Sequence, residues 1–61
     1  MIKGSTIRKA RKQVGESQIE FAKRFGVHQS TLSYWETDKN SPRGPALRFV
    51  KQVLAELEDA E

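Results

Sequence analysis

The 61-residue chain contains no cysteine and only one histidine, His28. These absences exclude a disulfide framework and a zinc site built from several Cys and His residues, which are common sources of extra stability in small domains. No apolar run is long enough to cross a bilayer, and the N-terminus lacks the continuous apolar stretch of a signal peptide. We therefore expect one soluble, cytoplasmic domain over residues 1–61, held together by helix packing.

The sequence also lacks a catalytic constellation. A single histidine cannot form a triad or a metal cluster, and no nucleophile has a general base near it in the sequence. We expect no enzymatic activity, no cofactor and no metal site. The function is then expected to be one of binding.

Charge is divided unevenly along the chain. Residues 1–43 hold nine basic and four acidic side chains, a balance of +5, whereas residues 44–61 hold two basic and four acidic ones, a balance of −2. A basic front with a weakly acidic tail suits a domain that presents one face to a polyanion and keeps its last helix away from it. A lysine-rich solvated surface would give the same numbers, so charge alone does not decide between the two.

Apolar periodicity predicts a first helix over about residues 5–13. Its apolar face consists of Ile7, Ala10 and Val14, at spacings of three and four. Ser5 or Thr6 is the expected N-cap, because a hydroxyl at that position accepts a backbone N–H. Gly15 ends the helix, since glycine readily adopts the left-handed conformation that follows many helices.

A second, short helix is predicted to begin at the capping box Ser17-Gln18-Ile19-Glu20. Ser17 can satisfy the amide of Glu20, and Glu20 can reach back to the amide of Ser17. The apolar face of this helix is Phe21, Ala22 and Phe25. Gly26 follows where the chain must turn sharply, with an expected positive φ, and Val27 can pack inward across that turn.

The second half of the chain predicts two more helices. In residues 29–36, Leu32 and Trp35 share an inward face, while the outer face is polar and almost uncharged. Residues 37–45 contain two prolines and other turn formers and predict a loop. Pro45 suits the first position of a last helix that extends to about Leu57. The apolar stripe of this helix is Ala46, Leu47, Val50, Val53, Leu54 and Leu57, with Phe49 at its edge.

A short helix, a tight turn with glycine and a third helix with polar residues outward are the parts of a helix-turn-helix. The stretch SQIEFAKRFGVHQSTLSYWE resembles the phage-repressor and Cro-type (XRE-like) helix-turn-helix family, and the match extends to Pro42. The positions in the family's spacing are Gln18, Ala22, Gly26, Val27, Leu32, Trp35 and Glu36. The following SPRGPALRFVKQVL resembles the DNA-binding domains of certain antitoxins and small repressors. The resemblance implies an all-α, λ-repressor-like bundle of four to five helices and binding to double-stranded DNA.

Expected contacts with DNA divide into base contacts and phosphate contacts. The outward residues of the third helix can reach base edges in the major groove, and they are Gln29, Ser30, Ser33 and Tyr34. The expected phosphate contacts are Gln18, Thr31, Lys39 and Arg43. Gln18 is included because the amino end of a helix favours an anion, a role that the resemblance also implies. For Lys39 and Arg43, the ordinary solubility of a loop explains the charge almost as well.

The resemblance also implies a partly buried ion pair between Arg11 and Glu36. Two positions depart from the family's pattern. His28 stands where the family usually has Ser or Thr as the cap of the third helix, and histidine is a weaker cap. We interpret His28 as a surface residue near phosphate rather than a pH switch. Glu16 stands where the family more often has an apolar residue.

The main prediction is a sequence-specific transcriptional regulator, a repressor that works as a symmetric homodimer on half-sites about 34 Å apart. The alternative is an antitoxin or bridging type of protein-interaction module, in which the last helix docks another protein and DNA binding is secondary. Its signature would be an exposed apolar strip of Phe49, Val53 and Leu57, which we also place at or beside a subunit interface. RNA binding is less favoured, because the chain has no aromatic platform for single strands.

Overall fold

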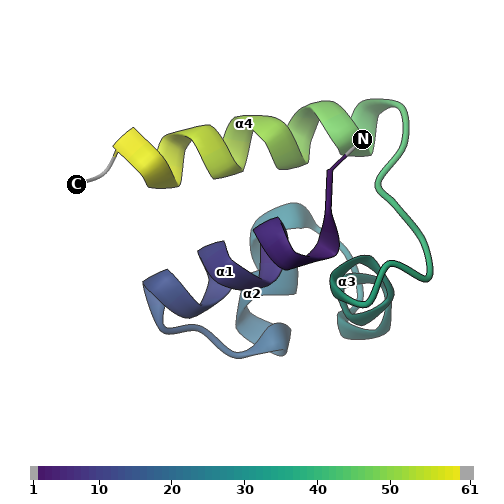
Figure 1. Cartoon of the computed structure of the whole chain (residues 1–61), viewed down its shortest axis with the longest axis horizontal. Coiled ribbons are helices and arrows are strands. Elements are labelled where there is room, and N and C mark those ends of the chain that lie inside the picture. The colour runs from purple at the N-terminus through teal and green to yellow at the C-terminus, as the bar shows by residue number, and fades with distance from the viewer. Residues whose placement is uncertain (1, 60–61) are drawn as a thin grey trace.

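The computed structural model describes residues 2–59, which contain four helices and no strand (Figure 1). The helices are α1 (Gly4–Val14), α2 (Gln18–Phe25), α3 (Gln29–Glu36) and α4 (Pro45–Asp59). Figure 1 shows α4 running along one side of the molecule, with α1 and α2 beneath it and α3 seen nearly end-on. The predicted all-α class and the bundle of four to five helices are confirmed. None of the described helices is long and apolar enough to cross a membrane.

The second helix begins and ends as its sequence predicts. Ser17 Oγ accepts the N–H of Glu20 at 3.1 Å, and Glu20 Oε1 accepts the N–H of Ser17 at 3.0 Å, which completes the capping box. Gly26 ends the helix with a φ of 67°, a left-handed conformation that glycine adopts without steric cost. The N–H of Val27 then donates to the carbonyl of Ala22, so the turn into α3 is short and closed by hydrogen bonds.

The start of α1 differs from the prediction. The helix begins at Gly4, and its N-cap position is Lys3, so neither Ser5 nor Thr6 is the cap. The first turn is capped instead by Asp38, whose Oδ1 accepts the N–H of Gly4 at 2.9 Å. Asp38 lies 34 residues away in the sequence, and a cap from so distant a residue leaves no local pattern to find.

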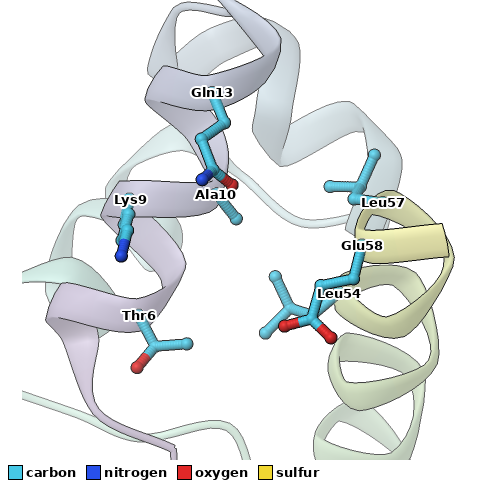
Figure 2. Close-up of a pocket in the computed structure, with 7 residues that line it drawn as sticks. All are labelled: Thr6, Lys9, Ala10, Gln13, Leu54, Leu57 and Glu58. Atoms are coloured by element: carbon cyan, nitrogen blue, oxygen red, sulfur yellow. The ribbon is translucent and has the colours of Figure 1, made fainter. Parts of the chain in front are cut away.

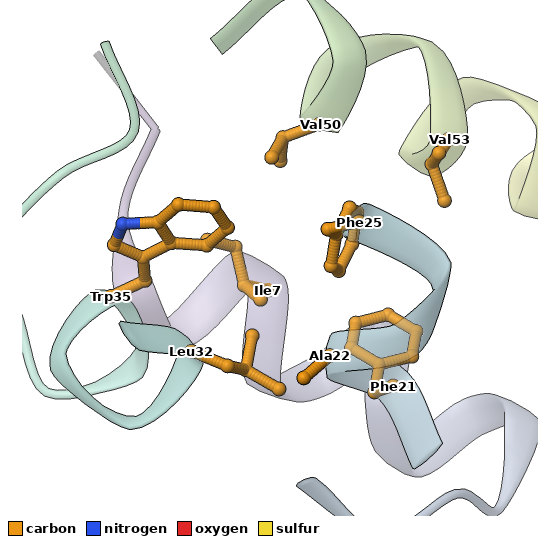
Figure 3. Close-up of a cluster of buried hydrophobic side chains, with 8 residues drawn as sticks. All are labelled: Ile7, Phe21, Ala22, Phe25, Leu32, Trp35, Val50 and Val53. Carbon is orange, nitrogen blue, oxygen red and sulfur yellow. The ribbon is translucent and has the colours of Figure 1, made fainter. Parts of the chain in front are cut away.

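One cluster of buried apolar side chains, drawn from all four helices, forms the core (Figure 3). Its members are Ile7, Phe21, Ala22, Phe25, Leu32, Trp35, Val50 and Val53. The ring of Phe25 makes edge contacts with three other aromatic rings. These are Phe21, Trp35 and Phe49, at centroid distances of 5.0, 6.1 and 6.5 Å. Each fully buried large side chain contributes about 1.5–3 kcal/mol. This cluster therefore holds both α3 and α4 firmly against α1 and α2.

The apolar strip on α4 whose exposure would mark a protein-interaction module is mostly covered. Val53 is 8% exposed and belongs to the core, and Leu57 is half-buried, so only Phe49, at 44%, is largely exposed. The strip is covered because α4 packs against both α1 and α2, which together cover a wider stripe than one helix would. Val14 also departs from its expected place, since it lies in the last turn of α1 and is 36% exposed.

Candidate nucleic-acid interface

The residues of α3 divide between the core and the surface. Leu32 and Trp35 are buried, while the side that faces solvent is polar. The residues expected to contact bases are placed there: Gln29, Ser30 and Tyr34 are exposed and Ser33 is half-buried. The one acidic residue of α3, Glu36, has a side chain that is only 3% exposed. The outer face of α3 therefore carries no exposed negative charge that would repel a phosphate backbone.

A chain of hydrogen bonds connects Gln29 to the protein interior. Gln29 Nε2 donates to Gln18 Oε1 at 3.3 Å, and Gln18 Nε2 donates to Glu36 Oε1 at 3.2 Å. A carboxylate can only accept, so the amide of Gln18 must turn its NH₂ group to Glu36 and its oxygen to Gln29. Gln18, expected as a phosphate contact, thus has a second task, because its side chain orients the first residue of α3.

The buried carboxylate of Glu36 is held by Arg11. Arg11 Nε lies 2.8 Å from Oε2 and Nη2 lies 3.1 Å from Oε1, so the pair is bidentate, and the Arg11 side chain is 15% exposed. Arg11 Nη1 also donates to the carbonyl of Glu16 at 3.2 Å. The hydrogen bond with Glu36 raises the pKa of Arg11 above its ordinary value, although burial acts in the opposite direction. The pair joins α1 to the end of α3, behind the polar face.

His28 is placed at the N-cap of α3, where its ring takes the part of a capping side chain. Nδ1 accepts the backbone N–H of Ser30 at 3.1 Å and lies 2.9 Å from Ser30 Oγ. Nδ1 is bonded to Cγ, as the oxygen of an Asn or Asp cap is, so it can accept from the same backbone amide. His28 is also exposed, so the capping group lies on the same surface as Gln29 and Ser30.

The expected phosphate contacts lie around this face. Thr31 is half-buried on α3, and both Lys39 and Arg43 are exposed in the segment between α3 and α4. Lys39 Nζ lies 5.7 Å from the centre of the Tyr34 ring, within the range of a cation–π contact. The structure therefore brings together one expected phosphate contact and one expected base contact, Lys39 and Tyr34, and leaves Arg43 further along the same loop.

A second ion pair was not found from the sequence. Arg24 Nη2 lies 2.6 Å from Glu16 Oε2, and Arg24 Nε lies 2.9 Å from Glu16 Oε1. The hydrogen bond with Arg24 lowers the pKa of Glu16 below its ordinary value of 4.5. Glu16 lies in the turn between α1 and α2, and Arg24 lies eight positions later, in α2. Helical spacing therefore does not indicate that the two residues form a pair. The ion pair with Arg24 explains how a glutamate is accommodated at position 16, where the family more often has an apolar residue.

A hollow of about 390 Å³ lies between α1 and α4 (Figure 2). No residue of α3 lines it. Its lining residues are Thr6, Lys9, Ala10, Gln13, Leu54, Leu57 and Glu58. Figure 2 shows Leu54 and Leu57 directed from α4 toward Ala10 on α1. Among residues 2–59, no group of three or more His, Cys, Asp or Glu side chains is arranged to hold a metal ion.

Comparison with known families agrees with this geometry. A family model described as helix-turn-helix matches residues 7–56, which span most of α1, all of α2 and α3, and most of α4. The chain therefore belongs to the helix-turn-helix proteins of the phage-repressor and Cro type, a family of DNA-binding regulators. No curated protein and no solved structure matches the chain.

Proposed function

We propose that this protein is a sequence-specific regulator of transcription, a repressor that reads the major groove with α3. The observation that carries the proposal is the placement of Gln29. Its amide is exposed at the first turn of α3 and is held by Gln18, which is held in turn by the buried Glu36. A glutamine amide can pair with adenine through two hydrogen bonds, and an amide that is already oriented loses less entropy when it does so.

Polar and charged side chains around α3 supply the sequence-independent part of binding. Lys39 and Arg43 on one side of α3, and Gln18 and Thr31 near its start, are proposed to contact the phosphate backbone. Such contacts fix the position of the helix on the duplex and give binding that weakens as salt rises. A regulator of this kind acts where the chromosome is, so we propose a cytoplasmic location.

We further propose that the protein acts as a homodimer. The outer face of one α3 offers only three or four side chains to base edges, which is too few for a single domain to select one site. Two copies on half-sites about 34 Å apart would double the contacts. Phe49, which is 44% exposed and whose ring makes an edge contact with that of Phe25, is an apolar side chain of α4 that is available for a subunit contact.

A second candidate function is that of an antitoxin or bridging module that binds another protein through the last helix. The observation in its favour is the hollow between α1 and α4, where Leu54 and Leu57 are only partly buried. In that case DNA binding would be secondary. The two candidates differ in whether the isolated protein selects a DNA sequence.

Selection of bound duplexes from a random DNA pool tests the proposal, with the mass of the complex in solution measured alongside. We expect a defined sequence with two-fold symmetry and a mass of two protein chains per duplex. Recovery of unrelated sequences would contradict the reading role of α3 and favour the protein-interaction module. A defined but asymmetric site bound by one chain would uphold sequence reading and contradict the homodimer.

A further inference from the structure

We infer that His28 sets the hydrogen-bonding polarity of the Ser30 hydroxyl, so that Ser30 acts toward DNA bases as an acceptor only. The inference rests on the proposed function of α3 as the reading helix. Two contacts converge on one ring nitrogen: Nδ1 of His28 lies 3.1 Å from the backbone nitrogen of Ser30 and 2.9 Å from its Oγ. Both residues are exposed at the start of α3, where base edges are expected.

The backbone N–H of Ser30 determines which nitrogen of the His28 ring carries the proton. An amide N–H can only donate, so Nδ1 must offer its lone pair, and the proton of the neutral imidazole is then on Nε2. With Nδ1 unprotonated, its contact with Ser30 Oγ is a hydrogen bond only when the hydroxyl donates. The Ser30 proton is therefore directed toward His28, and the lone pairs of Oγ are left to accept from outside the protein.

This polarity restricts the bases that Ser30 can contact. In the major groove adenine N6 and cytosine N4 are donors, whereas guanine N7 and O6 and thymine O4 are acceptors. A free serine hydroxyl rotates and serves either class. A hydroxyl whose proton is held by His28 can accept from adenine or cytosine but has no proton for guanine or thymine. His28 is thus a positioning residue for specificity, and the base that Ser30 faces is adenine or cytosine.

The variant His28→Gly separates this role from helix capping. Glycine is well tolerated at an N-cap, so the variant keeps α3 while it removes the acceptor that holds the Ser30 proton. Ser5→Ala is the matched control, because it removes an exposed hydroxyl on α1 that is not among the proposed contacts with DNA. Circular dichroism of each variant tests whether its helix content equals that of the wild type.

The experiment uses four duplexes, each with a different base at the position sensitive to Ser30→Ala. Each duplex is titrated with wild type, H28G, S30A, S5A and the double variant H28G/S30A. Wild type is expected to favour adenine or cytosine over guanine or thymine by about fivefold, the effect of one neutral hydrogen bond. H28G should reduce this ratio to less than about twofold and should change nothing further in the S30A background. S5A should keep the wild-type ratio.

A wild-type preference for guanine or thymine would overturn the inference, as would an H28G ratio equal to that of wild type. If S30A alters no preference while wild type still selects a defined site, the inference fails and the proposed function stands. If wild type selects no site at all, both fail. Nitrogen-15 NMR gives an independent reading of the ring: a proton on Nε2 supports the inference, and a proton on Nδ1 overturns it.

Discussion

Asp38 accepts the N–H of Gly4 through Oδ1 at 2.9 Å and does so from a left-handed backbone conformation with a φ of 62°. The contact joins the residues that follow α3 to the first turn of α1. Two requirements favour aspartate at position 38. Asp and Asn tolerate a positive φ better than most residues, and a carboxylate is favourable at the amino end of a helix. The end of α3 is thus fixed by the start of α1.

Substitutions of Asp38 are expected to reveal both requirements, the acceptor oxygen and the tolerance of a positive φ. D38A loses the cap and places alanine in the left-handed region, so we expect a loss of about 1–2 kcal/mol in the free energy of unfolding. D38N keeps an acceptor oxygen and a residue that tolerates positive φ, so its loss should be smaller. Urea denaturation measures both. Equal stability of wild type and D38A, or equal damage by the two variants, would contradict this account.

Gly4 is required by a close approach rather than by its backbone angles. A Cβ at this position would overlap the carbonyl oxygens of Trp35 and Glu36 at the end of α3. G4A should therefore force the two helices apart and destabilise the fold by about 1–3 kcal/mol. S5A in the same turn is the control, because Ser5 is exposed and is not the cap. If thermal unfolding shows G4A to be as stable as S5A, the two helices do not meet as described.

Removal of Arg11 should be costly because it leaves a buried charge without its partner. The Glu36 side chain is 3% exposed and accepts two hydrogen bonds from the Arg11 guanidinium. We expect R11M to lower the free energy of unfolding by about 3–5 kcal/mol. R8M replaces an exposed arginine on the same helix and should change stability by less than about 0.5 kcal/mol. Similar stabilities of R11M and R8M would show that Glu36 is solvated.

The ion pair between Glu16 and Arg24 predicts a dependence of stability on pH. The pKa of Glu16 is lowered in the folded protein, so its contribution is fully present above the ordinary glutamate pKa of 4.5 and is lost as pH falls through the folded pKa. Wild type should therefore be more stable than E16Q near neutral pH, and the difference should vanish in acid. Parallel urea titrations from about pH 7 to pH 3 measure it. A difference that does not change with pH would show that Glu16 is not paired.

Local patterns were sufficient to predict most of the fold. The capping box at Ser17, the positive φ of Gly26 and the proline at the start of α4 each depend on a few neighbouring residues, and each is present in the structure. The cap from Asp38 and the contact of Glu16 with Arg24 join residues that no helical period relates. Only the packed structure brings such residues together, so the sequence alone could not indicate them.

The candidate site shows the same division. Position in a helix-turn-helix was enough to place Gln29, Ser30 and Tyr34 on the outer face of α3. The hydrogen bonds that orient those side chains were not predictable, because they depend on distances between Gln18 and Gln29 and between the His28 ring and Ser30. Sequence position thus indicates which side chains face outward, and packing determines which way their polar atoms point.

The central claim, that α3 reads bases while the loop after it contacts phosphates, is tested most directly by titrating a selected duplex and a scrambled one at several salt concentrations. Q29A should lose about 1–3 kcal/mol of discrimination between the two and leave binding to the scrambled duplex almost unchanged. R43A should weaken binding to both alike and reduce the magnitude of the salt slope by about 0.9. If Q29A, S30A and Y34A all leave the ratio of the two affinities at the wild-type value, α3 is not the reading helix and the account is wrong.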